Sequence, residues 1–267
     1  MKKLLIAVSA LAALTGSAFA ADMAPAPYTK APVFVPPAYN WTGFYISGGF
    51  GGGLWAADTS TIFNATGLPL TQNQRMGGSG WFGTVGAGYD WQFNGGWVAG
   101  ILADGQFGSL SGSISTDRPS FLRTGGGVST GTETLRNSYA AGVRLGYLVA
   151  PNVLSYVNGG YSGSQWSGAA YSLLIGGGPP LLSTPSFTRN GWFIGGGVEN
   201  SLGFFGPGWF MKTEYRAAYY GTATLPETFI PTNTLTTFSE TFKPWVQTVS
   251  TSLVYRFNWS GPVVAKY

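Results

Sequence analysis

Apolar and polar residues alternate with a period of two along residues 79–110. In residues 81–93 the odd positions are mostly aromatic or aliphatic, whereas the even positions are small or polar. The sequence Asn94-Gly95-Gly96 interrupts this alternation, which resumes over residues 97–107. A period of two indicates a β-strand, and an Asn-Gly pair between two such runs favours a tight hairpin turn. We therefore predict two antiparallel strands joined at residues 94–96.

The two faces of this predicted hairpin differ in a way that points to a membrane. The apolar face has aromatic residues at its ends and small or aliphatic residues between them, and the other face carries glycines and single charges. This pattern is typical of strands that turn an apolar face to lipid and a polar face to the lumen of a barrel. A strand of about 13 residues, rising about 3.3 Å per residue and tilted by about 40°, spans roughly 30 Å, enough to cross the apolar band.

The same unit recurs along the chain and predicts eight strands. Long connections (56–79, 110–134, 167–188 and 221–244) alternate with short ones (94–96, 150–152 and 203–208). We therefore predict an all-β fold, an antiparallel up-and-down transmembrane barrel with short periplasmic turns, long extracellular loops and both termini in the periplasm. The alternation over residues 153–166 is too poor to assign its two faces. The predicted strands are 41–55, the two strands of 79–110, 135–149, 153–166, 190–202, 209–220 and 245–257.

The N-terminus reads as an export signal. Lys2 and Lys3 precede a short apolar run, and Ala18-Phe19-Ala20 fits the small-residue rule for cleavage. Residues 1–20 are therefore predicted to be a signal peptide. Residues 21–40 are rich in Pro and Ala and predict an extended periplasmic linker. The barrel is expected to occupy residues 41–259, followed by a C-terminal tail at 260–267.

Composition narrows the possible functions. Only 9 % of the residues are charged, 16 % are aromatic and 42 are glycine, which fits a barrel with an uncharged lipid-facing wall rather than a disordered chain. The sequence has no cysteine and no histidine, which excludes disulfides and removes the commonest general base and metal ligand. The net charge of +4 forms no basic stripe, so nucleic acid is not an expected partner. We predict no enzymatic activity, no cofactor and no metal site.

The predicted inward faces bring several charged residues into one narrow lumen. An eight-stranded barrel is just wide enough to be filled by side chains, and unpaired charges there are costly, so we expect ion pairs that close the lumen. Alternatively, the charges line the constriction of a narrow pore. Asp90 and Asp104 could in principle act as an acid–base pair, although carboxylates facing arginines are more often salt-bridge partners. The predicted lumen charge network consists of Asp90, Asp104, Arg136, Arg144, Glu199, Lys212, Glu214, Arg216 and Arg256.

Aromatic residues gather near the ends of the predicted strands and indicate two membrane interfaces. A soluble ligand-binding barrel would need the opposite facing, which periodicity alone does not exclude. The leader, the aromatic ends and the alternation of loop lengths favour the membrane barrel. The predicted interface residues are Tyr89, Trp91, Trp97, Tyr147, Trp209, Tyr255 and Phe257 near the short turns, and Trp81, Phe107, Trp192 and Trp245 near the long loops, where Trp55 and Tyr219 are also expected.

Four motifs carry a resemblance to a known family: residues 39–45 (YNWTGFY), 191–199 (GWFIGGGVE), 212–215 (KTEY) and 253–257 (LVYRF). Together with the preceding Pro/Ala-rich segment, they resemble the small, opacity-type outer-membrane β-barrel proteins of alphaproteobacteria, known as outer-membrane immunogenic or porin-family proteins. The resemblance covers the mature chain. It implies a β-barrel fold and an outer-membrane location but says little about function. Many such barrels end on an aromatic residue that the insertion machinery reads, and both Phe257 and Tyr267 are candidates here.

These observations lead to a functional prediction with one alternative. We predict an integral outer-membrane protein with a structural or surface role in envelope integrity, as a surface antigen or in adhesion. The alternative is a narrow porin for passive diffusion of small solutes. The expected partners are outer-membrane lipid and lipopolysaccharide, the barrel-insertion machinery through the C-terminal strand, and host or envelope proteins through the loops. The loops carry apolar residues such as Leu68 and Ile230, which either pack on one another or contact a partner.

Overall fold

The computed structural model describes residues 39–118, 127–172 and 178–257. The predicted signal peptide (1–20), most of the predicted linker (21–40) and the predicted tail (260–267) lie outside these described residues. One 3-10 turn, η3 (Gly203–Phe205), accompanies the strands. The strands are β1 (Gly43–Phe63), β2 (Gln74–Phe93), β3 (Trp97–Arg118), β4 (Gly127–Ala150), β5 (Val153–Trp166), β6 (Ala170–Ser172), β7 (Leu182–Ser183), β8 (Phe187–Ser201), β9 (Trp209–Tyr220), β10 (Ala223–Phe229) and β11 (Thr234–Phe257).

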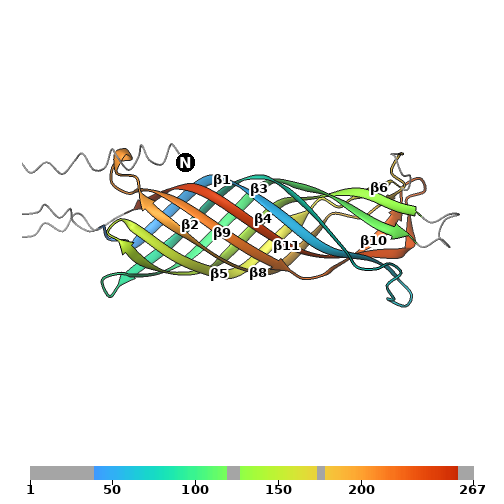
Figure 1. Ribbon diagram of the computed structural model, residues 1–267, viewed down its shortest axis with the longest axis horizontal. Helices are drawn as coiled ribbons and strands as arrows, with labels where there is room; N and C mark the ends of the chain where they lie inside the picture. Colours follow the sequence, from blue (N-terminus) through green and yellow to red (C-terminus); the bar gives the residue numbers. More distant parts are fainter. Residues whose placement is uncertain (1–38, 119–126, 173–177, 258–267) are drawn as a thin grey trace, which may run out of the picture. The chain divides into compact units, whose positions relative to one another are not determined.

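Eight of these strands form a closed ring in the order β1-β2-β3-β4-β5-β8-β9-β11. Every neighbouring pair is antiparallel. The ring closes where β11 returns to β1, with Phe257 opposite Phe44 at one end and Phe238 opposite Phe63 at the other. Figure 1 shows these strands running obliquely around the barrel. The predicted all-β, eight-stranded up-and-down barrel is therefore confirmed.

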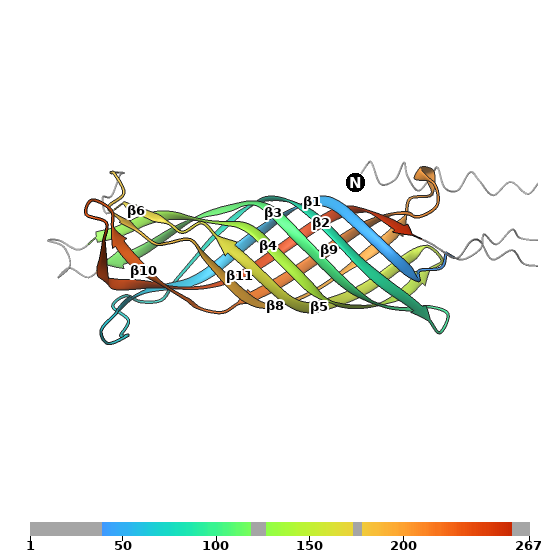
Figure 2. The ribbon, with the colours of Figure 1, turned by 180° about the vertical axis from the view of Figure 1, so that it is seen from behind.

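Three short strands extend the wall at the end of the barrel that carries the long connections, here called the long-loop end; the opposite end is the short-turn end. β6 pairs with β4, β7 joins β6 to β10, and β10 pairs with β11. Both views place β6 and β10 at this end (Figures 1 and 2). Because β5, β8 and β9 are only 12–15 residues long, these short strands continue the wall where the shorter strands stop.

Five ring strands are longer than the apolar alternation predicts. β1, β2, β3, β4 and β11 are 20–24 residues long, so large parts of the predicted loops are strand. The register of β3 and β4, for example, continues until Arg118 lies opposite Gly127. The prediction was wrong here because these segments are rich in Ser, Thr and Gly and lack the apolar face of the other segments. Backbone pairing alone extends the sheet and does not need that face.

The outer wall of the ring is apolar. Successive outward positions carry large hydrophobic side chains that are exposed in the isolated chain, which is the expected lipid-facing surface of a transmembrane barrel. Among the described residues, the structure contains no helix with the length and hydropathy needed to span a bilayer. Outward side chains from seven of the ring strands include Phe50, Val85, Ile101, Val143, Val157, Ile194 and Val249.

The predicted interface aromatics lie on this outer wall in two groups. At the short-turn end Trp97 contacts Tyr147 and Trp209 contacts Tyr255, with ring centroids 5.3 and 4.9 Å apart. Tyr89 and Trp91 also pair there, and Tyr255 contacts Phe257. At the long-loop end Trp192, Tyr219 and Trp245 form a stacked row, with centroids 4.7 and 6.0 Å apart. Trp81 and Phe107 are exposed nearby, with Gly83 of β2 opposite Phe107.

Trp55 is not part of an interface group, so its assignment to the long-loop rim was wrong. Its side chain is 1 % exposed and lies inside the barrel, where its indole N–H donates to the carbonyl oxygen of Leu110 at 2.8 Å. Trp55 shares the inward parity of Tyr45 and Ala57, whereas Phe50 and Leu54 are exposed on the opposite face. The run of glycines at 51–53 hides this alternation in the sequence.

The outward facing can be tested with a charge at mid-height. Val143 is 63 % exposed and lies midway between the outward residues Tyr139 and Tyr147 of β4. We expect Val143→Arg to lower the free energy of unfolding of the barrel by about 2–4 kcal/mol, because an arginine at the bilayer midplane is poorly solvated. The measurement is urea unfolding in lipid vesicles.

The matched control for Val143→Arg is Leu68→Arg, in the connection between β1 and β2. Leu68 is also exposed, and a surface substitution in water changes stability by about 0.5 kcal/mol or less. Equal effects of the two substitutions would contradict the assignment of Val143 to the lipid-facing wall.

Candidate functional site: the charged lumen

Four buried charges form a closed ring of ion pairs inside the barrel, toward the short-turn end. Asp90 and Glu199 are both fully buried, and each contacts both Arg144 and Arg256. Arg144 Nε donates to Asp90 Oδ1 at 2.8 Å, and its Nη1 lies 3.4 Å from Glu199 Oε2. Arg256 Nε donates to Glu199 Oε1 at 2.6 Å and its Nη1 to Asp90 Oδ2 at 2.7 Å. This four-charge ring carries no net charge.

The strands place these side chains at one level. Asp90 lies on β2, Arg144 on β4, Glu199 on β8 and Arg256 on β11, so they come from four separate strands of the barrel. Each has the inward parity of its strand, as the alternation predicts. Their guanidinium–carboxylate contacts therefore join strands that are not neighbours in the sheet, across the lumen itself.

Aromatic side chains surround the two arginines of this ring. The guanidinium carbon of Arg144 lies 4.4 Å from the ring centroid of Tyr45, and that of Arg256 lies 4.5 Å from the ring of Trp41. Phe210 also packs on the Trp41 ring, with centroids 4.8 Å apart. Buried cations over aromatic faces gain a cation–π contribution. The ring of charges is thus held in a cluster of buried aromatic and aliphatic residues, which comprises Trp41, Tyr45, Val98, Leu154, Tyr156, Phe210 and Val254.

A second group of charges is centred on Arg216. Its Nη1 and Nη2 donate to the two carboxylate oxygens of Asp104 at 2.8 and 2.7 Å, a bidentate arrangement. Its Nη2 also donates to Glu214 at 2.7 Å, and Lys212 lies 4.0 Å from the other oxygen of Glu214. Two acids and two bases make this group neutral as well. Phe193 lies under the Arg216 guanidinium, 4.4 Å from its carbon.

Arg136 lies apart from both groups, and its predicted place in the lumen was wrong. Its side chain is exposed, because the register of β4 against β5 shifts between Leu135 and Asn137. This bulge inserts one residue and reverses the facing of β4. Leu135 and Ala140 are therefore both buried although their numbers differ in parity. The predicted charge network consequently pairs four acids with four bases rather than with five.

Strand β5 supplies two polar side chains that the sequence did not reveal. Tyr156 Oη donates to Glu214 Oε2 at 2.8 Å, and Asn158 Nδ2 donates to the same oxygen at 3.0 Å. The even positions of β5 face inward, including Leu154 and Tyr156, whereas Val157 is exposed outside. The facing could not be assigned from the sequence because Gly, Ser and Tyr occupy positions on both faces. Asn158, which shares the parity of Leu154 and Tyr156, was the available signal for a polar contact on that face.

Little free volume remains between the two charge groups. The cavity there has a volume of about 10 Å³ and is lined by Tyr45, Asp104, Arg144, Lys212 and Glu214, among others. A cavity of this size holds about one water molecule. This cavity therefore leaves little space between the side chains that line it.

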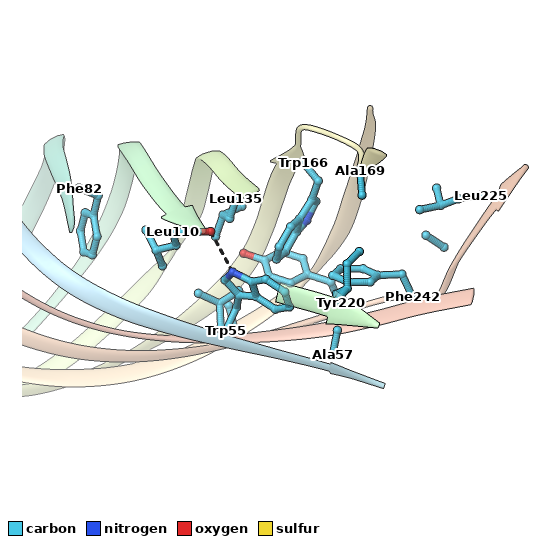
Figure 3. Close-up of a cluster of buried hydrophobic side chains, with 14 of the residues drawn as sticks. Trp55, Ala57, Phe82, Leu110, Leu135, Trp166, Ala169, Tyr220, Leu225 and Phe242 are labelled. Carbon is cyan, nitrogen blue, oxygen red and sulfur yellow. Dashed lines mark hydrogen bonds between the residues drawn. The ribbon is translucent and has the colours of Figure 1, made fainter. Parts of the chain in front are cut away.

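An aromatic plug lies beyond the charges, toward the long-loop end (Figure 3). Trp55, Trp166 and Phe242 contact one another with ring centroids 5.1–5.7 Å apart. Phe187 stacks on Trp166 and contacts Phe242. Figure 3 shows the Trp55, Trp166 and Phe242 rings close together, with Leu110 and Leu135 beside Trp55. We call Trp55, Trp166, Phe187 and Phe242 the aromatic plug.

Buried carboxylates also occur at the long-loop end, in segments that the sequence analysis took for loops. Glu133 accepts hydrogen bonds from the backbone N–H groups of Thr134 and Gly168 and from the Ser167 hydroxyl, at 3.0–3.2 Å. The hydroxyl of Tyr171 donates to Glu240. Within residues 39–118, 127–172 and 178–257, no cluster of three or more Asp, Glu, His or Cys side chains has a metal-binding arrangement.

Comparisons with known proteins agree with this architecture. Residues 6–257 match the family model described as outer membrane protein beta-barrel domain. The chain is 31 % identical over 221 residues to the 31 kDa outer-membrane immunogenic proteins of Brucella melitensis biotype 1 and Brucella suis biovar 1, which covers 80 % of this chain and 85 % of each relative. Among solved structures, the outer membrane protein OprG from Pseudomonas aeruginosa is similar with a TM-score of 0.43 and 9 % identity, covering 82 % of this chain and 98 % of that chain.

Proposed function

Because this chain belongs to the family of outer-membrane β-barrel proteins, we propose that it has a structural and surface role in that membrane, with no catalytic activity and with a lumen closed to solutes. The observation that carries this proposal is the four-charge ring. Asp90, Arg144, Glu199 and Arg256 are each 0–3 % exposed and contact one another across the lumen. A water-filled pore would leave such side chains hydrated instead.

Two further features support a closed lumen. The second charge group fills the next level, and the cavity between the two groups holds only about one water molecule. The aromatic plug then closes the following level with contacting rings. A solute would have to displace three successive layers of packed side chains, of which two are ion-paired.

The surface role is supported by the relatives and by the long-loop end. The similar proteins of Brucella are named as outer-membrane immunogenic proteins. We propose that the long-loop end faces the outside of the cell and that both termini lie in the periplasm, after removal of the signal peptide. Leu68 and Leu235 are exposed at the long-loop end, and they are candidates for contact with host or envelope proteins.

The C-terminal strand is the proposed contact with the barrel-insertion machinery. β11 ends on Tyr255 and Phe257, which pack together with ring centroids 4.9 Å apart. Phe257 is the last described residue of the barrel, and the other candidate, Tyr267, lies outside the described residues.

Planar-bilayer recording tests the closed lumen directly. The mature chain is refolded in detergent, its folding is verified by a change in gel migration on boiling, and single-channel current is recorded. We expect no discrete conductance steps. Steady steps from verified folded protein would overturn the closed lumen and favour the narrow porin, with the two charge groups as its selectivity residues.

A further inference from the structure

Two exposed cations flank an aspartate on the outer wall at the long-loop end. Asp58 of β1 is opposite Arg75 of β2 and opposite Lys243 of β11, so the three residues form one row across three neighbouring strands. All three are exposed. They have the outward parity of their strands, with Leu54 of β1 exposed on the same face. The row therefore faces away from the lumen.

This row borders the aromatic interface group. Two residues closer to mid-height, Trp245 of β11 lies opposite Ala56 and Tyr219. Tyr219 in turn stacks between Trp192 and Trp245. The guanidinium carbon of Arg75 lies 5.3 Å from the centroid of the Trp245 ring. Outward Trp and Tyr residues mark the level of the lipid headgroups, so the two cations lie at that level.

The row and the aromatic group enclose a surface pocket. Its volume is about 350 Å³, and its lining includes Asp58, Arg75, Tyr219, Lys243 and Trp245. Among the described residues, neither Arg75 nor Lys243 makes an ion pair within 4.0 Å. Their charges are therefore not neutralised by a direct contact, and the pocket keeps a net charge of +1 from two cations and one carboxylate.

We propose that this pocket binds the phosphate group of an outer-leaflet glycolipid, the chemistry presented by the lipid A portion of lipopolysaccharide. Arg75 offers a planar set of donors that suits phosphate oxygens, and Lys243 offers a second positive charge on the other side of the pocket. The aromatic residues that line the pocket, Tyr219 and Trp245, lie next to the lipid at the membrane interface. A membrane lipid fits this position because the pocket opens to the lipid-facing wall at headgroup level. This inference rests on the proposed orientation of the long-loop end, and is independent of whether the lumen conducts.

Replacing Asp58 tests the proposal through the opposite expected change in binding strength. Its carboxylate lies between the two cations in the register and repels a bound phosphate, so its replacement by a neutral residue strengthens binding. A pocket that recognised only the apolar part of a lipid would respond to neither change of charge.

The experiment titrates bisphosphorylated lipid A into the refolded full chain in neutral detergent micelles and follows binding by native mass spectrometry. The variants are Arg75→Gln/Lys243→Gln, Asp58→Asn and the matched control Arg136→Gln, an exposed cation outside the pocket. We expect about tenfold weaker binding for the double variant and severalfold tighter binding for Asp58→Asn. Arg136→Gln is expected to bind like the unmodified protein. Folding of each variant is verified by its gel shift on boiling.

Two further probes identify the source of the phosphate. Dephosphorylated lipid A is expected to bind at least tenfold more weakly, and inorganic phosphate alone to show no saturable binding. Equal binding of both lipid forms, equal losses for the double variant and Arg136→Gln, or tight binding of inorganic phosphate would each overturn the proposal. None of these outcomes bears on the bilayer recording, which tests separately whether the lumen conducts.

Discussion

Replacing Arg144 with methionine is expected to lower the free energy of unfolding of the barrel by about 3–5 kcal/mol, the usual effect of removing one partner from a buried ion pair. Arg144 contacts both Asp90 and Glu199, and these two carboxylates are 0 % exposed. Without Arg144 the two negative charges share only Arg256. The remaining charge imbalance lies among side chains that are 0–3 % exposed. Urea unfolding in lipid vesicles, followed by tryptophan fluorescence and gel migration, measures the change.

Two further variants distinguish the loss of stability caused by breaking the buried ion pairs from any effect of removing an arginine elsewhere. Arg136→Met removes the same group from an exposed position and is expected to change stability by about 0.5 kcal/mol or less. Adding Asp90→Asn to Arg144→Met removes one carboxylate together with its partner, and part of the lost stability is expected to return because a neutral group is easier to bury. If Arg144→Met and Arg136→Met were equally mild, the four charges would have to be hydrated, and the closed ring would be contradicted.

The fold and the inward facing of eight of the nine predicted lumen charges follow from a period of two. Alternation assigns Asp90, Glu199 and Arg256 to inward faces correctly, because each lies in a segment whose opposite face is mostly apolar. Alternation does not predict the register between paired strands. The register decides whether an arginine on β4 meets a carboxylate on β2 or on β3. That choice depends on pairing between backbones far apart in sequence, and it fixes which four charges share one level.

Two departures from the predicted site have the same physical origin. Arg136 follows Leu135 in a β4 bulge, which reverses the facing of the strand. The residue types around the bulge do not reveal this reversal. Trp55 follows three glycines, which remove the side chains that would show the alternation. In both places the residue types suit either face of the strand. The pairing with neighbouring strands decides which side chains point into the barrel. The long-loop strands were missed for a related reason, since Ser and Thr at those positions do not distinguish strand from loop.

The neutral charge balance of the lumen also depends on that bulge. With Arg136 outside, the described lumen holds Asp90, Glu199, Asp104 and Glu214 against Arg144, Arg256, Arg216 and Lys212. Each group of four is neutral by itself, so neither group needs a distant counter-charge. An additional inward arginine would add a fifth cation to these four acids and would be costly to bury without a carboxylate of its own. The bulge instead turns Arg136 to the outside.

Replacing Trp166 with alanine is the second change with a large expected effect. Trp166 is 0 % exposed and contacts Trp55, Phe187 and Phe242 within the aromatic plug. Its loss leaves a cavity and removes buried apolar contacts, so we expect the free energy of unfolding to fall by about 3–5 kcal/mol. The matched control is Trp81→Ala, since Trp81 is 75 % exposed on the outer wall and its removal leaves no enclosed cavity. A smaller loss is expected there, again measured by urea unfolding in vesicles.

The same variant tests whether the aromatic plug is needed for the proposed closure of the lumen. In the bilayer recording Trp166→Ala is expected to remain silent, because the four-charge ring lies in series with the plug and keeps all of its contacts. Discrete conductance steps from folded Trp166→Ala protein would mean that the plug alone blocks the lumen, and that water and ions pass between Arg144 and Arg256 although the structure joins both to the same carboxylates. Silence together with the loss of stability would indicate that the ion-paired layers close the lumen without the plug, and that the plug contributes mainly to stability.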